Sequence, residues 1–458
     1  MQNEHPPTDR RALSPLKIVS YAGVAIGAIV LLSVLVLLFF PDPFVNRFVK
    51  PRITRAFAEA YPAYSIRIAD MNCSILKNRF GCDSVALSAV DGTFSSSLSA
   101  FAVSGIDWMH LLWGGHLRPE NFAGVLLDAH EIELEFPESH YVVRCERLRV
   151  SVPDSEIVAD SVALHPSADD EEFFSVSAFR TTRFSVVTSQ CSVMGLAFLE
   201  LLEGKSYRTR SVRIQDLFLD VLVNKDKRNA KDTIVPPMPN EMLSSIEGTL
   251  QVDSLSIMNG RLKYGERFAV GAKPALITMD SMEVLAEGIA NHGDPGAAVV
   301  VHAKGKFMKA GTMNVRMSFP VASPEFSFQF SGSMSRMELS ALNSFLEIAE
   351  QMRIKEGVLQ AATFDISVAS GRARGKVRAL YRDLTLASIN RHTGSERGFS
   401  DAITSYIANN FKIRRTNLPD KSGSIKIGEV KYMRKRDDPF FRFEWFALRS
   451  GLKDVAGF

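Results

Sequence analysis

The stretch Met313–Pro320, MNVRMSFP, decides the fold class, because every second side chain in it is apolar. This period of two is the pattern of a β-strand that buries one face. A second run with the same period, Phe326–Phe330, follows after a short turn. The apolar positions of the two runs are Met313, Val315, Met317, Phe319, Phe326, Phe328 and Phe330. The two runs predict neighbouring strands with methionine and phenylalanine on one face.

The same alternation recurs from Tyr64 to the end of the chain, and Gly, Asn, Asp and Ser separate the short runs. Strands spread this evenly, without long helices between them, predict a mainly β, antiparallel architecture. A last run, Phe441–Trp445, predicts a closing strand. Further apolar positions that we expect on the buried face are Leu217, Leu219, Val221, Val223, Leu255 and Ile257.

Two short helices interrupt the strand pattern, at 337–352 and at 399–411. The first of them has Ser335 as an expected N-cap and Glu338 three residues later, which is the spacing of a capping box. A charged, proline-ending loop at 224–240 divides the β-rich part into regions 64–223 and 241–458. The acidic run Ser167–Glu172, SADDEE, is interpreted as a solvated turn.

The run Ile18–Phe40, IVSYAGVAIGAIVLLSVLVLLFF, contains no charged residue. As a helix rising about 1.5 Å per residue, it is long enough to cross a hydrocarbon core of about 30 Å. We therefore expect a tail at 1–15 and a transmembrane helix at 16–40. The alternative is a cleaved signal peptide, but its apolar region would be shorter and would end at small residues. Basic residues flank the span on both sides, so charge alone leaves its orientation open.

The segment 41–63 after the span is amphipathic and has two readings. It forms a helix on anionic lipid headgroups, or it packs its apolar side on the following domain. Cys73 and Cys82 flank an expected turn, and here too two arrangements stay open: a disulfide across a hairpin, or two buried free thiols.

The sequence carries none of the nucleotide-binding, nucleophile-elbow or zinc-protease motifs, and its nine histidines lack metal-ligand spacing. We expect a protein that is not an enzyme and has no cofactor. The formal charge of +3 is too small to indicate a nucleic-acid partner. Basic residues crowd the last fifty positions next to aromatic ones, which suits contact with phosphate-bearing headgroups, or a solvated edge that prevents strand pairing. The candidates for headgroup contact are Lys431, Arg434, Lys435 and Arg436.

Several stretches in order resemble the AsmA-like family of bacterial envelope proteins. Phe101–Phe136, FAVSGIDWMHLLWGGHLRPENFAGVLLDAHEIELEF, is similar to the family's N-terminal pattern of strand, short turn and further strands. Thr249–Arg267, TLQVDSLSIMNGRLKYGER, resembles an internal pattern of its uncharacterised members, and 326–386 resembles the C-terminal block. The ending DDPFFRFEWFALRSGLK is similar to the closing segment of some members. One departure is Asp128-Ala129-His130, where relatives often have a proline.

The resemblance implies one anchor in the bacterial inner membrane and a periplasmic body whose long sheet curls into an apolar groove, a β-taco. It also implies a role in binding or passing phospholipid acyl chains for the outer membrane, with envelope proteins as partners. From the residues alone, a closed β-sandwich explains the same alternation. That alternative predicts an envelope scaffold that carries no lipid, and a glycan-binding module is a third reading.

Overall fold

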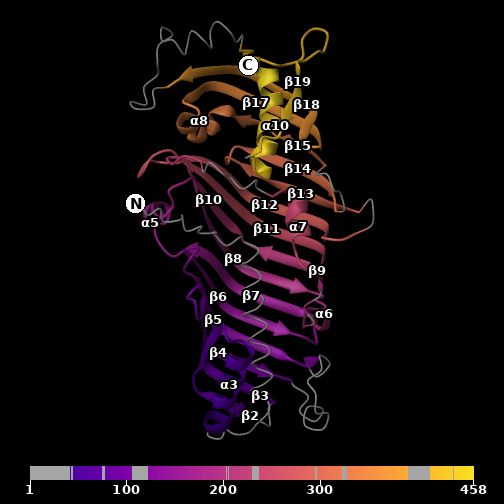
Figure 1. Ribbon diagram of the computed structural model, residues 1–458. Helices are drawn as coiled ribbons and strands as arrows, with labels where there is room; N and C mark the ends of the chain where they lie inside the picture. Colours follow the sequence, from indigo (N-terminus) through magenta and orange to yellow (C-terminus); the bar gives the residue numbers. More distant parts are fainter. Residues whose placement is uncertain are drawn as a thin grey trace, which may run out of the picture. The chain divides into compact units, whose positions relative to one another are not determined.

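The computed structural model shows a mainly β protein whose chain divides into two compact units, 1–168 and 169–458 (Figure 1). Within the described part of the chain, no helix is both long and apolar enough to cross a membrane. The expected span at 16–40, the expected helix at 399–411 and Phe326 lie outside that part. The described residues are 42, 45–74, 78–105, 122–202, 204, 206–229, 237–293, 297–321, 327–389, 413–436 and 438–457.

The first unit is an antiparallel meander preceded by a helix. A π-helical turn at Val45–Val49 leads into α3, Lys50–Ala60. Both β1 and β2 pair with β3, and each later strand pairs with the one before it. The strands are β1 Tyr64–Ile68, β2 Met71–Ser74, β3 Arg79–Ala89, β4 Ser95–Ser104, β5 Leu126–Phe136, β6 Tyr141–Ser151 and β7 Glu156–Pro166.

Helix α3 packs against β1 with its apolar side, on which Ile53 and Phe57 are buried. These two residues are four positions apart and therefore lie on one helix face. For α3, the structure agrees with the interpretation in which segment 41–63 packs its apolar side on the following domain. The buried side of α3 continues the apolar face of the strands, where Val85, Leu98 and Leu127 are also buried.

The second unit holds the remaining strands and five helices among its described residues. Its strands are β8 Thr182–Met194, β9 Ser206–Gln215, β10 Phe218–Asn224, β11 Thr249–Arg267, β12 Ala275–Ala290, β13 Ala298–Phe307, β14 Gly311–Pro320, β15 Phe328–Met334, β16 Met337–Glu338, β17 Met352–Ala369, β18 Arg372–Ser388 and β19 Ile427–Met433. Its helices are α5 Asp170–Ser175, α6 Phe198–Leu202, α7 Pro239–Ser244, α8 Asn343–Ala349 and α10 Phe440–Ala456.

The sheet of the second unit is mixed, which corrects the expectation of a purely antiparallel one. The long strand β11 pairs in parallel with β9 along its first half and with β10 along its second half. All other strand pairings of this sheet are antiparallel among the described strands. A parallel pair needs a long return connection, and residues 225–248, which include α7, supply it.

Strands β9 and β10 together form one interrupted strand between β8 and β11. Asp216 interrupts it with a positive φ of 51°, and Asn259 of β11 has a φ of 54° at the same level. The Asn259 side-chain amide donates a hydrogen bond of 2.6 Å to the Asp216 carboxylate. The register between β11 and β12 shifts beside Asn259, as expected of a β-bulge that bends a strand.

Two segments differ from their sequence-based assignments. Phe441–Trp445 belongs to helix α10, because the longer series Phe443, Ala447, Gly451 and Val455 repeats every four residues and is buried. A five-residue window of alternating aromatics cannot distinguish the two periods. The expected helix 337–352 is instead β16, a 3-10 turn and α8, and Ser335 accepts a hydrogen bond from the Thr312 N–H rather than capping a helix.

Candidate functional site: the apolar face beneath and beside α10

One apolar face of the second unit can be followed from strand to strand through the sheet register. Residues that lie opposite each other in neighbouring strands point to the same side. We call this side the α10 face, because helix α10 packs on part of it. Going from β9 to β17, the cross-strand partners on it include Val212, Leu255, Ala286, Val301, Met317, Phe330 and Ile366.

Helix α10 packs on the α10 face over β18 and β19, and its first turn contacts Phe328 of β15 (Figure 1). Its Phe443 and Ala447 are fully buried and pack in one cluster with Val377 of β18 and Val430 of β19. Gly451 permits this close approach, because a Cβ there would lie 2.6 Å from a methyl group of Val377 and 2.7 Å from one of Val430. The helix is therefore fitted directly onto the strands.

Three residues predicted for the apolar face are buried in this covered half. Phe319, Phe328 and Phe330 are 8%, 2% and 4% exposed and belong to the cluster beneath α10. Phe328 contacts the rings of Phe440 and Phe443, with ring centroids 5.3 and 6.2 Å away. These side chains are hydrophobic core, as the closed-core reading of the sequence expects.

The last strand of the sheet is also protected by α10. The N–H groups of Glu429 and Lys431 in β19 donate to Asp454 and Ser450 of α10, at 2.8 and 3.2 Å. The hydrogen bond from Glu429 lowers the pKa of Asp454 below its usual value. Side chains of the helix thus satisfy backbone groups of an edge strand that would otherwise pair with another chain.

The α10 face continues over β8 to β12, where its apolar side chains are half-buried. The predicted residues Leu219, Val221 and Val223 of β10 lie here, opposite Leu262, Tyr264 and Glu266 of β11. The predicted Leu255 and Ile257 lie opposite Val212 and Ile214 of β9. Apart from Ala275 and Ala286, the apolar residues of this half are not fully buried, and Phe184 of β8, opposite Val221, is 42% exposed.

A band of methionines crosses the α10 face from β12 to β15. Met313 of β14 lies opposite Gly305 on one side and opposite Met334 of β15 on the other. Because Gly305 has no side chain, Met279 and Met282 of β12 fill the space above it, about 3 Å from the position of a Cβ. Methionine is unbranched and polarizable, so this band can adapt to the shape of what it contacts.

The end of α10 nearest its first residue carries exposed aromatic side chains. Phe441 is 79% exposed and Trp445 is 43% exposed. Their spacing places them on the same stripe of the helix as Leu448 and Leu452, which pack against the buried clusters. This stripe continues the apolar surface of α10 beyond its contact with the sheet.

Glu444 is an acidic residue on the otherwise apolar side of α10 that faces the sheet. Its Oε1 is enclosed and forms no hydrogen bond within the described part of the chain. Burial raises the pKa of this carboxyl to about 8. On β11, burial first and Glu266 second raise the pKa of Tyr264, whose hydroxyl donates to Glu266 at 2.8 Å. Burial thus favours the protonated, uncharged form of both Glu444 and Tyr264.

Two of the four candidates for headgroup contact have partners within the protein, and the side chains of the other two are exposed. Lys431 pairs with Glu429 on the same strand, and the Arg434 guanidinium donates to the Asp438 carbonyl at 3.2 Å. The side chains of Lys435 and Arg436 are exposed in the turn between β19 and α10. Asp438, which is fully buried, holds this turn by accepting from the Tyr432 hydroxyl and the Lys435 N–H.

Cys73 and Cys82 are free thiols in the structure, so the disulfide reading is not realised. Cys73 of β2 lies opposite Phe80, whereas Cys82 of β3 lies opposite Met71. The two cysteines are therefore diagonal neighbours rather than a directly opposed pair. Burial raises the pKa of the Cys82 thiol to about 12.

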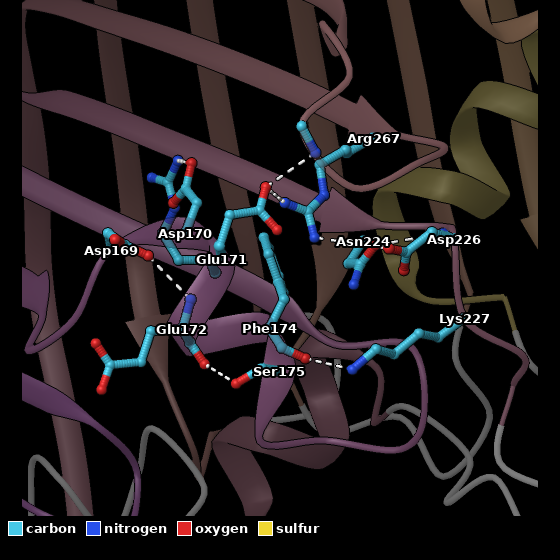
Figure 2. A network of polar contacts seen from close by, with 12 residues as sticks. Asp169, Asp170, Glu171, Glu172, Phe174, Ser175, Asn224, Asp226, Lys227 and Arg267 are labelled. Atoms are coloured by element: carbon cyan, nitrogen blue, oxygen red, sulfur yellow. Dashed lines mark hydrogen bonds and ion pairs between the residues drawn. The ribbon is translucent and has the colours of Figure 1, made fainter.

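The acidic run 167–172 is the start of helix α5 and not a solvated turn. Asp169 caps the helix by accepting from the Glu172 N–H at 2.9 Å (Figure 2). Asp170 lies 2.9 Å from Arg183 of β8, and Glu171 lies 2.5 Å from Arg267 of β11. The sequence indicated the acidic charge but not its basic partners, which lie far away along the chain.

The two arginines under α5 are unusually buried, with side chains 9% and 5% exposed. The Arg267 guanidinium lies 4.6 Å from the centre of the Phe174 ring, and Phe174 itself is buried (Figure 2). Arg183 lies opposite Leu222, the neighbour of Val221, so this network occupies the side of the sheet turned away from the α10 face. We interpret it as the attachment of α5 to the sheet.

The structure brings most of the predicted apolar residues onto one face and separates them into two environments. Comparison with family models and with curated proteins finds no match for this chain. Among the described residues, no cluster of His, Cys, Asp or Glu has the arrangement to hold a metal ion. The candidate site therefore rests on the α10 face itself.

Proposed function

We propose that the protein binds acyl lipid on the uncovered half of the α10 face and supports lipid homeostasis or assembly of the bacterial outer membrane. One observation supports this proposal most. The apolar face that forms the core beneath α10 continues without a break over β8 to β12, where its side chains stay half-buried. An apolar surface of this kind needs an occupant, and acyl chains match its unbranched and aromatic lining.

The wider setting of this proposal comes from the sequence. The uncharged run 18–40 and the resemblance to AsmA-like proteins support an anchor in the inner membrane and a body in the periplasm. In that setting the protein has no catalytic role and acts as a lipid carrier or conduit. Envelope proteins would be its partners.

The proposal is tested with two pairs of adjacent residues in the full chain. Ile257 and Val284 lie on the α10 face, whereas their neighbours Met258 and Leu285 are 46% and 39% exposed on the opposite side. We expect Ile257→Asp and Val284→Asp to lower the phospholipid that co-purifies with the protein, as measured by mass spectrometry. Met258→Asp and Leu285→Asp are the matched controls and should leave it unchanged.

A second candidate is an envelope scaffold that carries no lipid. The covered half favours it, because Phe328 and Phe330 are core residues beneath α10. Under this reading the unaltered protein is free of lipid after gel filtration. The Asp variants on the α10 face would then alter only stability or partner binding.

A further inference from the structure

A row of cations lies on the side of β18 that is turned away from α10. Arg372, Arg374, Lys376 and Arg378 are all exposed, and the residues between them belong to the α10 face. Residues two apart in a strand lie about 6.7 Å from each other, so the row extends over about 20 Å. We call these four residues the β18 basic row.

The register joins this row to the basic region near the end of the chain. Arg374 lies opposite Lys431 of β19, although more than fifty residues separate them in sequence. Arg372 lies opposite Met433, which is 52% exposed on the same side. Two carboxylates, Asp365 and Glu429, accompany Lys376 on this side, so positive charge predominates.

The charges of the β18 basic row are not neutralised by ion pairs. None of its four members has an ion-pair partner within the described residues, whereas Lys431 pairs with Glu429. Arg374 and Lys431 place like charges directly opposite each other, an arrangement that reduces the stability of a sheet. Binding of an anionic partner would offset this repulsion.

We propose that the β18 basic row, with Lys431, docks the protein on an anionic phospholipid bilayer surface. A row of cations about 20 Å long on one sheet face matches a plane of phosphate headgroups. Each cation near such a surface contributes about fivefold to affinity, which corresponds to about 1 kcal/mol. The exposed Met433 adds an apolar contact that a headgroup layer accommodates and an aqueous polyanion does not.

The composition of this side of the sheet favours a bilayer over single-stranded nucleic acid. Proteins that bind single strands stack bases on aromatic side chains between their cations. The outward residues of β17 and β19 that flank the row are Thr363, Asp365, Ser367, Ala369, Ile427, Glu429, Lys431 and Met433, and none of them is aromatic. The row therefore offers charge without a stacking surface.

The test measures binding of the full chain, held in phosphatidylcholine nanodiscs, to supported bilayers. One bilayer contains phosphatidylcholine alone, and the other contains phosphatidylglycerol as well. We expect binding only to the anionic bilayer, with an affinity that falls as salt is added. The double variant Arg374→Gln with Lys376→Gln should weaken it about 25-fold, as expected from two contributions of about fivefold each.

The matched control is Lys304→Gln with Lys306→Gln on β13. These cations are also exposed on the side turned away from α10, so the variant loses the same charge elsewhere. The proposal is overturned if both double variants lose the same affinity, or if the protein binds neutral and anionic bilayers equally. It is also overturned if a single-stranded oligonucleotide binds more tightly than the anionic bilayer and depends on the same two residues.

The bilayer-docking surface goes beyond the proposed lipid-binding function. An experiment can reject either proposal without rejecting the other. Ile257→Asp should reduce co-purified lipid and leave bilayer docking intact, because Ile257 lies on the opposite side of the sheet. The variant of Arg374 and Lys376 should do the reverse. Loss of docking alone therefore leaves the α10-face proposal untouched.

Discussion

The carboxyl of Glu444 opposes folding whenever it is ionised. It lies on the buried side of α10, its Oε1 has no hydrogen-bond partner, and its pKa is raised from 4.5 to about 8. Below pH 4.5 both the folded and the unfolded chain hold the proton, and no cost arises. Between pH 4.5 and 8 the unfolded chain releases the proton while the folded chain keeps it, so stability falls as pH rises.

We predict that Glu444→Gln flattens this pH dependence. The amide keeps the shape of the carboxyl but cannot ionise, so the variant should be more stable than the parent above pH 8, by on the order of 5 kcal/mol at most. Urea unfolding at several pH values measures the effect. Glu356→Gln, at an exposed position of β17, is the control. If Glu444→Gln shows the same slope of stability against pH as the parent, burial does not perturb this group.

At the level of single residues, alternation predicted the face but not the neighbours across it. Met313 was placed on the apolar face from its period of two, and the structure agrees. Its neighbour Met334 and the pair Met279 and Met282 were not predicted, because the register that joins their strands is invisible in one sequence. Bulges such as that at Asn259 also shift the period, which hides an otherwise regular pattern.

Helix α10 is the element on which the covered half depends. A side chain at Gly451 would meet Val377 and Val430 closer than real Cβ atoms come to their neighbours. We predict that Gly451→Val forces α10 away from the sheet and destabilises the protein by about 1–3 kcal/mol, the usual cost of overpacking. Chemical denaturation followed by circular dichroism measures the loss.

Lys453→Val adds the same side chain at an exposed position of α10 and should change stability much less. Equal destabilisation by the two variants would mean that the β-branched residue disturbs the helix itself, and that the contact at Gly451 is not tight. The apolar surface uncovered by a displaced α10 would also make the Gly451 variant more prone to aggregate.

Helix α5 is held by ion pairs to two buried arginines as well as by its buried Phe174. Arg267 is almost fully buried between Glu171, Asp226 and the Phe174 ring. We predict that Arg267→Met destabilises the protein by about 3–5 kcal/mol, because it leaves Asp226, whose side chain is only 11% exposed, without its cation. Glu171→Gln should cost less, because the Glu171 side chain is 48% exposed and water can replace it.

Urea unfolding of the two single variants and of the double variant measures their coupling. We expect the double variant to be less destabilised than the sum of the single ones. Strict additivity would mean that Arg267 and Glu171 do not interact, and that α5 is held mainly by Phe174.

Among whole elements, strands were easier to predict than the helices that cover them. Long alternating runs such as 313–320 identify a strand without help from the rest of the chain. The acidic start of α5 cannot be identified as a helix from its own residues alone, because it forms ion pairs with Arg183 and Arg267 on strands that are distant in sequence. In α10, the aromatic residues at 441–445 alone match the period of a strand. The helical period becomes visible only when the buried Ala447, Gly451 and Val455 are included.

For the molecule as a whole, the sequence left two readings of the apolar face, and the second unit contains both environments. Under α10 the face is a closed core, whereas over β8 to β12 it is half-buried. No local pattern distinguishes these environments, because the same alternation serves a covered and an uncovered strand. The parallel return of β11 beside β9 and β10 was equally hidden, since it depends on the connection 225–248.

The most direct test of lipid binding is site-specific photo-crosslinking in the native membrane. A photoreactive phenylalanine analogue replaces Ile257 or Val284 on the α10 face, and Met258 or Leu285 on the opposite face. After illumination, mass spectrometry identifies what is attached to the purified protein. We predict phospholipid adducts at 257 and 284 and none at 258 and 285. Equal labelling of both faces, or only protein adducts at 257 and 284, would contradict the account.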